Sequence, residues 1–362
     1  MHHRLTALFL ALGPARPWFK QVDRNTVRAD AVAGLSNAAV VLPQGVAFAI
    51  IAGLPPEFGL FTAVVVSLIA GIWGSSMIMV SGPTTAISAV VFGSMSQFAV
   101  PGSDDYIALV LSLTLMVGVI QIVAGVFKLG GLISFISHSV LIGFTAAAAF
   151  LIAASQLNGA LGLSKGAGGG VFERLFHAAE NIGGANATAM LISAATILTL
   201  VLLSRVSKKM PAYIIALAVG TAVAWVLDAP AQGVAMFSPL RSIVPSFGAP
   251  EISFDLVTEL LPVAATVAFV GLLEAISIGR SFALRRDEPY NSSQEMVGQG
   301  LSNAVGAFFQ CYAGSGSFTR SGLNADAGAQ TPLSTIFAAG FLVILLFVLA
   351  PYLEYVPVPA MA

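Results

Sequence analysis

The stretch GSGSFTRSGLNADAGAQTP, residues 314–332, decides the fold class, because it sets small polar residues and one arginine, Arg320, between two strongly apolar stretches. Its part at 316–328 predicts a Ser/Thr/Gly-rich turn that leads into a helix too short to cross a bilayer. A second stretch, SGPTTAISAV at 81–90, begins in the same way. Each predicts a helix N-terminus at mid-membrane, and the question is what these two ends and an arginine face there.

The composition of the whole chain is that of a polytopic, all-α membrane protein. Hydrophobic residues make up 57% of the 362 residues and charged residues 9%, against about 25% charge in a soluble domain. The net charge of −1 gives no basis for a nucleic-acid partner. One cysteine and four scattered histidines show no metal-ligand spacing, so we expect neither a metal nor another cofactor. An intramembrane enzyme is disfavoured, because no nucleophile–base pair or HExxH motif occurs.

Hydropathy divides the chain into eleven segments. A bilayer core of about 30 Å needs about 20 apolar residues per spanning helix, and the third and tenth segments are too short to cross. The segments are predicted at 31–53, 58–75, 83–98, 106–128, 132–160, 187–205, 211–227, 255–283, 292–310, 319–330 and 332–350.

The distribution of basic residues predicts a cytoplasmic N-terminus, because short cytoplasmic loops are rich in Lys and Arg. With that orientation, twelve of the sixteen Lys and Arg lie inside and three lie outside. The inside residues are Arg4, Arg16, Lys20, Arg24, Arg28, Lys128, Arg205, Lys208, Lys209, Arg280, Arg285 and Arg286; the outside residues are Lys165, Arg174 and Arg241. Arg320 is then the one basic residue placed within the membrane.

The two short segments together predict an anion site. Pro83 suits the first helical position of one, and Ser81, Ser317 or Thr319 can cap a helix start. A helix start carries roughly half a positive charge, so two starts and Arg320 attract an anion. Because the short segments are the third and the tenth, seven apart, they also suggest two inverted repeats of seven spans that meet at the bilayer midplane.

Side chains of neighbouring helices are expected to line this site. Gln44 and Phe48 are four residues apart and share a helix face. Glu274 lies mid-span, which costs about 2.5–3.5 kcal/mol, so it should have a partner, and Arg320 is the nearest by topology. A dianion about 6 Å from an ionised Glu274 would be repelled by roughly 5 kcal/mol at an effective dielectric of about 20. Anion binding would therefore favour a proton on Glu274, and the coupling is reciprocal.

Structural roles compete with these functional ones. Arg320 can serve as a counter-ion for Glu274 or Asp326, and Glu274 can be a structural partner of Arg320. Phe48 and Phe318 can be ordinary lipid-facing or core aromatics. The glycines of GVIQIVAGVFKLGG, 118–131, are predicted to allow close helix packing, not to bind a ligand. His138 is read as interfacial and Cys311 as inert.

The sequence resembles the sulfate permease (SulP) family of anion transporters. VLPQGVAFAIIAGLPPEFGLFTA, 41–63, is similar to the family's first-helix signature, and GSFTRSGLNADAGAQTP, 316–332, to that of its tenth segment. The resemblance implies a fold of seven plus seven inverted spans, with a core and a gate domain. The site residues that it implies for the anion are Gln44, Phe48, Thr84, Phe318, Thr319 and Arg320, with Glu274 linked to the coupling ion.

The resemblance also implies where the domains of the chain begin and end, and which regions of the family it lacks. We expect the chain to stop before segments 12–14 and before the cytoplasmic STAS domain of the family, and a homodimer to form through those missing regions. The predicted parts are a cytoplasmic arm at 1–28, the first core repeat at 29–130, the first gate repeat at 131–230, the second core repeat at 250–352 and the start of segment 12 at 353–362.

The function that these observations favour is uptake of sulfate with protons, by an elevator-type movement of the core against the gate in the inner or plasma membrane. Transport of bicarbonate or a dicarboxylate on the same frame, with sodium as a coupling ion, is one alternative. An anion channel, an exchanger or a voltage-responsive membrane motor is another.

Overall fold

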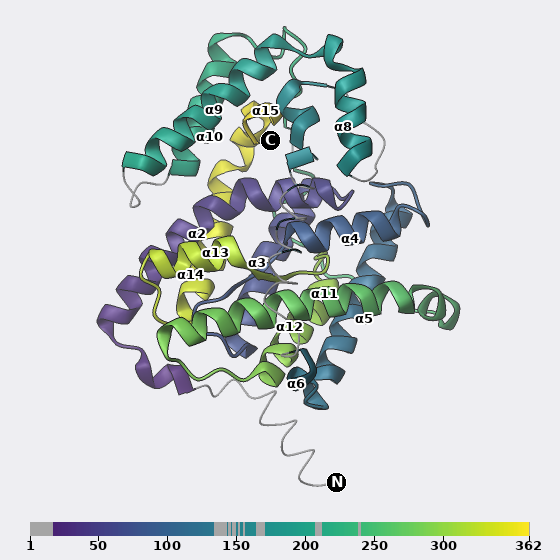
Figure 1. Ribbon diagram of the computed structural model, residues 1–362, viewed down its shortest axis with the longest axis vertical. Helices are drawn as coiled ribbons and strands as arrows, with labels where there is room; N and C mark the ends of the chain where they lie inside the picture. The colour runs from purple at the N-terminus through teal and green to yellow at the C-terminus, as the bar shows by residue number, and fades with distance from the viewer. Residues whose placement is uncertain are drawn as a thin grey trace. The chain divides into compact units, whose positions relative to one another are not determined.

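The computed structural model describes residues 17–133, 143, 146, 150, 153, 154, 156–163, 171–206, 212–237 and 240–361. These residues form helices and one pair of short strands, and the chain divides into two compact units. Unit 1 comprises residues 1–142 and 244–343, and unit 2 comprises residues 143–243 and 344–362. Figure 1 shows the helices of each unit with their labels.

The helices and strands of unit 1 come from both ends of the chain. They are η1 (Pro17–Gln21), α2 (Arg24–Ile51), α3 (Pro56–Trp73), β1 (Val80–Gly82), α4 (Thr85–Met95), α5 (Asp104–Val126), α6 (Gly130–Ile133), α11 (Phe254–Arg286), α12 (Ser292–Ala307), β2 (Ser315–Ser317), α13 (Phe318–Asp326) and most of α14 (Leu333–Leu349). Unit 2 contains α8 (Val171–Glu180), η2 (Ile182–Gly184), α9 (Ala187–Val206), α10 (Ala212–Val226), η3 (Ala350–Tyr355) and α15 (Val358–Met361).

The described helices lie close to the predicted segments, with two differences. The first span begins at Arg24 and not at 31, so the predicted arm 1–28 overlaps α2, and residues 1–16 of that arm lie outside the described residues. Most of the segment predicted at 132–160, with His138, also lies outside them. Helix α8 was not predicted. Its Phe172 and Phe176 are too few to stand out in a hydropathy average.

The early start of α2 follows from a cap. The backbone N–H of Thr26 donates to the Asp23 carboxylate over 2.7 Å, and the Thr26 hydroxyl donates to the same oxygen over 2.8 Å. These bonds satisfy a free amide of the first turn. The hydrogen bond from the backbone of Thr26 also lowers the pKa of the Asp23 carboxyl, because it stabilises the ionised form. A hydropathy count does not register a cap of this kind.

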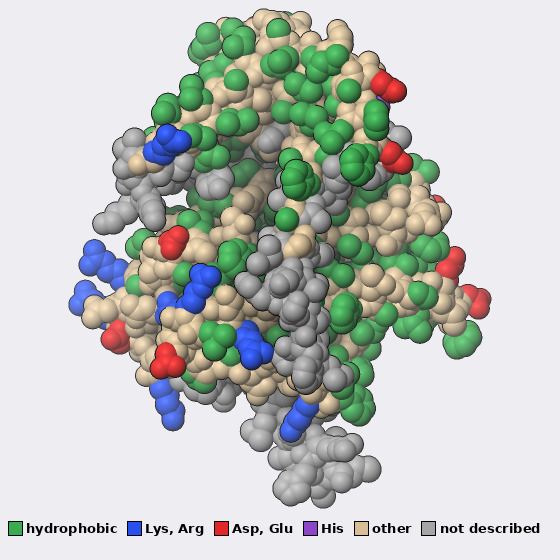
Figure 2. All heavy atoms as spheres, viewed as in Figure 1, with side chains coloured by type: hydrophobic (Ala, Val, Ile, Leu, Met, Phe, Trp, Pro, Cys, Tyr) green, Lys and Arg blue, Asp and Glu red, His purple; other side chains and the backbone are tan. Residues whose placement is uncertain are grey.

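Four of the described helices are long and apolar enough to cross a membrane, namely α2, α3, α5 and α11. Figure 2 shows Lys and Arg side chains gathered on the left of unit 1, around the start of α2 and the end of α11. The exposed residues there include Arg24, Arg28, Arg285 and Arg286. The cytoplasmic orientation of the N-terminus stays a prediction.

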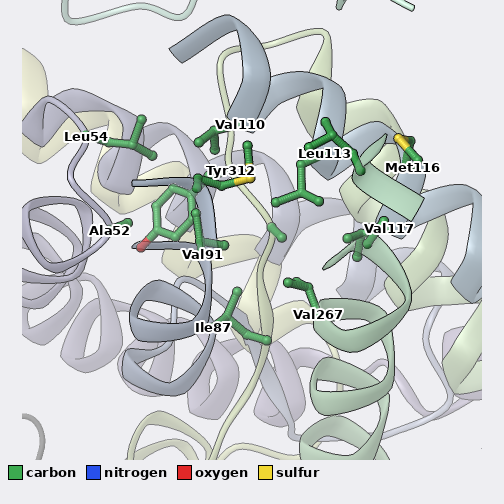
Figure 3. Close-up of a cluster of buried hydrophobic side chains, with 14 of the residues drawn as sticks. Ala52, Leu54, Ile87, Val91, Val110, Leu113, Met116, Val117, Val267 and Tyr312 are labelled. Atoms are coloured by element: carbon green, nitrogen blue, oxygen red, sulfur yellow. The ribbon is translucent and has the colours of Figure 1, made fainter. Parts of the chain in front are cut away.

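The largest hydrophobic cluster of unit 1 joins α4, α5 and α11 (Figure 3). Ile87 and Val91 of α4 point toward Leu113 of α5 and Val267 of α11, and all four are buried. Within a bilayer such side chains stabilise the packing of the helices through van der Waals contacts, because lipid tails are as apolar as they are. This cluster fixes the half-length helix α4 against two spanning helices, although α4 itself is only 11 residues long.

Glycines bring α5 and α12 into close contact, as was predicted for residues 118–131. A Cβ atom on Gly118 would lie 2.4 Å from the backbone nitrogen of Ala304, and one on Gly125 would lie 2.6 Å from the Val297 side chain. Gly300 of α12 meets α5 in the same way, because its Cβ would lie 2.5 Å from the nitrogen of Ile122. Small residues of this kind let two helix backbones approach.

Replacing Gly118 by alanine is expected to lower the stability of unit 1. The added methyl group has no space against the Ala304 backbone, and overpacking of this kind costs about 1–3 kcal/mol. Thermal unfolding in detergent should therefore occur several degrees lower. Gly93→Ala is the matched control, since Gly93 lies in α4 with open space around it, and its unfolding temperature should not fall. Equal unfolding temperatures for the two variants would refute the close packing of α5 on α12.

Unit 2 is held together mainly by α9, α10 and α15. The Ser193 hydroxyl of α9 donates to the Pro359 carbonyl over 2.9 Å. Asn186, ahead of α9, donates to the Gln232 carbonyl over 2.7 Å. Ala189, Ile192, Ala224 and Ala360 form its small core. The assignment of the two units to a core and a gate domain stays a prediction.

Candidate functional site

The site is built on two short strands that the sequence analysis did not predict. β1 pairs with β2 antiparallel, with Val80 opposite Ser317 and Gly82 opposite Ser315. All six residues of the pair are buried. The backbone N–H and C=O groups of a strand inside a membrane must all have hydrogen-bond partners. Side chains add hydrogen bonds to this strand pair. The Ser321 hydroxyl accepts from the Val80 N–H over 3.0 Å, and Gln299 donates to the Ser81 hydroxyl over 2.7 Å.

Each strand leads directly into a half-length helix. Thr84 caps α4, and its hydroxyl accepts from the N–H of Ile87; Ser317 caps α13 and accepts from the N–H of Arg320. The prediction that Pro83 occupies the first helical position was wrong, because Pro83 precedes the cap residue. Of the three caps predicted, Ser317 is confirmed. Ser81 lies in β1 and Thr319 is the second residue of α13.

The antiparallel register brings both helix starts to the strand pair. β1 ends at Gly82 and β2 ends at Ser317, which lie at opposite ends of the ladder. Helices α4 and α13 therefore leave in opposite senses, and Figure 1 shows α4 to the right and α13 to the left of the strands. Both N-terminal ends, with their partial positive charge, lie at the ladder.

Arg320 lies at this junction and is buried, with 1% of its surface exposed. Its Nη2 donates to the Pro83 carbonyl over 2.7 Å, which ties the first turn of α13 to the segment that starts α4. Among the described residues its Nε has no hydrogen-bond partner and no carboxylate lies within 4 Å of the guanidinium. A buried guanidinium with an unpaired N–H can donate a hydrogen bond to an anionic oxygen.

Glycine is required at position 82 for the guanidinium to fit. Gly82 has a φ of +140°, a conformation that L side chains rarely adopt, and its Cβ would lie 2.8 Å from Nη1 of Arg320. The guanidinium therefore lies against the backbone of β1 at a place where any other residue would displace it.

Substitution of Gly82 by alanine is expected to displace the Arg320 side chain. We expect anion affinity to fall about tenfold or more, because a shifted guanidinium loses part of a charge-assisted hydrogen bond worth about 1.5–3 kcal/mol. Equilibrium binding of labelled sulfate measures this effect. Gly322→Ala on α13, where nothing lies within 4 Å of the added carbon, should bind like the unaltered protein. Unchanged affinity in Gly82→Ala would contradict the assigned position of Arg320.

Glu274 of α11 is half-buried, and its carboxylate has a hydrogen-bond partner that was not predicted. The Thr84 hydroxyl donates to Glu274 Oε2 over 3.0 Å, so the residue that caps α4 also holds this carboxylate. Arg320, the nearest partner by topology, attracts Glu274 electrostatically, but no ion pair within 4 Å joins the two groups among the described residues. Asp326, the other suggested counter-ion, is exposed at the end of α13.

The remaining predicted site residues lie around this centre with fewer contacts. Phe318 and Thr319 are exposed at the start of α13. The Phe318 ring packs on the buried Phe282 ring of α11, with centroids 5.7 Å apart. Gln44 and Phe48 are half-buried on α2, which packs against α4 and α13. The Gln44 side chain has no hydrogen bond within the described part of the chain. The structure thus joins Thr84 to Glu274, and Arg320 to Pro83 just before Thr84, by hydrogen bonds. No such bond links Gln44 or Phe48 to them among the described residues.

Asn324 anchors α13, and the sequence analysis did not single it out. It is fully buried, accepts from Asn37 of α2 over 2.9 Å, and donates to the Ile78 carbonyl and to the Ser334 hydroxyl of α14. These bonds hold a nine-residue helix that is too short to be stable by itself. The available signal was an amide side chain in a stretch placed within the membrane.

Comparison with known proteins links this arrangement to one family. The model of the sulfate permease family matches residues 27–362. Sulfate transporter 1.2 of Arabidopsis thaliana is 33% identical over 361 residues, which cover 95% of this chain and 55% of that protein. High affinity sulfate transporter 2 of Stylosanthes hamata is 31% identical over 357 residues, which cover 95% and 54%. The chain therefore spans about half the length of these curated relatives.

A solved structure shows the same fold. The transmembrane domain of the cyanobacterial bicarbonate transporter BicA superimposes with a TM-score of 0.83 at 23% identity, over 94% of this chain and 86% of that domain. The predicted fold class, a helical membrane protein of inverted repeats with two half-length helices, is thereby confirmed.

Proposed function

Because this chain belongs to the sulfate permease family, we propose that the protein is a secondary active transporter of inorganic anions that takes up sulfate together with protons. The family is one of transporters, which are not enzymes, and the chain is a multi-pass membrane protein. The curated relatives described above are named as sulfate transporters, which supports sulfate as the substrate. The N-terminus is proposed to be cytoplasmic.

The observation that carries this proposal is the buried Arg320 guanidinium between two helix starts. One donor of the guanidinium is used on Pro83 and its Nε is unpartnered within the described residues. An oxyanion bound there would accept hydrogen bonds from this Nε–H and from backbone N–H groups at the starts of α13 and α4. We propose that Thr84, Phe318, Thr319, Gln44 and Phe48 line this anion site, with Arg320 as its centre.

Proton coupling is proposed to occur at Glu274. A dianion close to an ionised carboxylate is repelled, so anion binding favours the protonated form and a bound proton favours the anion. The Thr84 hydroxyl that holds Glu274 belongs to the residue that caps α4. A change in the charge of Glu274 therefore acts on one of the two helix starts that would bind the anion.

Movement of the site across the membrane is proposed to be of the elevator type. The core domain, segments 1–4 and 8–11, would move against the gate domain as a body. Such a movement requires a compact unit that carries the whole site, and all seven proposed site residues belong to unit 1. A homodimer and lipid contacts complete the proposal.

The proposed function is tested by uptake of labelled sulfate into proteoliposomes that contain the full-length protein. We expect accumulation when an inward proton gradient is imposed and none when a sodium gradient replaces it. Labelled bicarbonate, tested in parallel, should not accumulate. Accumulation driven by sodium, or uptake of bicarbonate in preference to sulfate, would overturn the proposal. Currents far faster than carrier turnover would favour a channel.

A further inference from the structure

The Arg285 side chain, near the end of α11, is not one of the proposed site residues. It is exposed, and its guanidinium carbon lies 5.8 Å from the centroid of the Phe282 ring. Within the described part of the chain it has no hydrogen bond and no ion pair, so its five N–H donors and its charge are available. An aromatic ring under a guanidinium fixes the position of the charge without neutralising it.

The Phe282 ring connects this charge to the proposed site. Phe282 is buried on α11, and its ring also packs against the ring of Phe318, the first residue of α13. The two contacts together put the Arg285 guanidinium within about 12 Å of the Phe318 ring. The Debye length is about 8 Å at physiological salt and about 30 Å at 0.01 M, so the Arg285 charge acts on an ion near Phe318 mainly at low ionic strength.

Arg285 and Glu274 lie on the same side of α11. Residues 274, 278, 282 and 285 recur at helical spacing, so Glu274, Ile278, Phe282 and Arg285 share one stripe of the helix. Eleven residues correspond to about 16 Å along the axis. One end of the stripe holds the carboxylate bonded to Thr84, and the other holds an exposed cation.

Arg286, the next residue, has a side chain that is already paired, so it serves as an internal comparison. Its Nε pairs with Glu288 over 2.7 Å and its Nη1 donates to the Ala329 carbonyl over 3.0 Å. Both arginines lie in the last turn of α11, where a cation is favoured by the helix dipole. A role in stabilising the helix end would therefore apply to both residues, whereas only Arg285 is free to attract an anion.

We propose that Arg285 is an outer anion-collecting residue for the site at Arg320: it attracts a free oxyanion dianion, such as sulfate, to the end of α11 beside Phe318 before the anion reaches the buried guanidinium. This proposal rests on the proposed function and adds a residue that determines how readily the anion arrives.

The test is the concentration dependence of labelled sulfate uptake by the full-length protein, in proteoliposomes of known orientation. Arg285→Gln is expected to raise KM about three- to fivefold at low ionic strength, with Vmax changed less than about twofold. At about 0.5 M of an inert salt the difference should disappear, because the charge is screened. Arg285→Lys should retain most of the affinity, since the charge remains. Arg286→Gln should show the KM of the unaltered protein.

Several results would overturn the role of Arg285. They are an unchanged KM in Arg285→Gln at low salt, an increase that does not depend on salt, and an equal increase in Arg286→Gln. If Arg285→Gln does not fold, a raised KM in Arg285→Lys with no dependence on salt would also contradict it. Failure of the proposed function looks different, because the unaltered protein would then show no sulfate uptake at either salt concentration.

Discussion

Sulfate affinity is expected to fall about 30-fold or more when Arg320 is replaced by alanine. Removing one partner of a buried charged hydrogen bond costs about 2–5 kcal/mol, and about 1.4 kcal/mol is a factor of ten. The substitution leaves the two helix starts in place but removes the only full positive charge found at the strand pair among the described residues. Equilibrium binding of labelled sulfate to purified protein measures the change.

Two controls separate binding from folding in this experiment. Arg320→Lys keeps a positive charge but loses the planar fork, so we expect an affinity between those of the alanine variant and the unaltered protein. Arg286→Ala removes an exposed arginine from a surface ion pair and should leave affinity unchanged. If Arg320→Ala is properly folded and binds sulfate with unchanged affinity, Arg320 does not hold the anion.

Replacement of Glu274 by glutamine is expected to abolish proton-driven accumulation of sulfate. Glutamine can still accept the hydrogen bond of the Thr84 hydroxyl, so the start of α4 should keep its geometry. It cannot take up a proton, however, and uptake should no longer increase as the external pH is lowered. Exchange of internal for external sulfate can continue, because it needs no net proton movement. Uptake measured at several external pH values, with and without a gradient, gives both quantities.

The matched control for this variant lies on the same helix. Glu259 is an exposed carboxylate near the start of α11, away from the strand pair. Glu259→Gln should retain the pH dependence of the unaltered protein. If Glu274→Gln still accumulates sulfate against its gradient when protons flow inward, coupling takes place elsewhere.

Much of the fold could be predicted from sequence because membrane helices leave a strong local signal. A spanning helix needs about 20 apolar residues, and the ends of α3, α5 and α9 lie within about two residues of the predicted ones. The half-length helices were recognisable for the same reason. Ser317, the cap of α13, was among the residues expected to cap it because small hydroxyl side chains favour that position.

The contacts that make the site could not be predicted in the same way. β1 and β2 are three residues each, rich in Ser and Gly, and lack the alternating pattern of a strand. Their pairing joins residues more than 230 positions apart. The hydrogen bond from the Thr84 hydroxyl to Glu274 was missed because topology suggested only an opposite charge, Arg320, as a partner. The space that Gly82 leaves for Arg320 is likewise visible only once the strands are paired.

The most direct test of the account is the position of a bound anion. Selenate has the shape and charge of sulfate, and its selenium atom can be located by anomalous diffraction from crystals of the protein. We predict a single strong peak within hydrogen-bonding distance of the Arg320 guanidinium, next to the first turns of α4 and α13. A selenate ion bound elsewhere, while selenate still competes with sulfate for binding, would contradict the claim that these groups hold the anion.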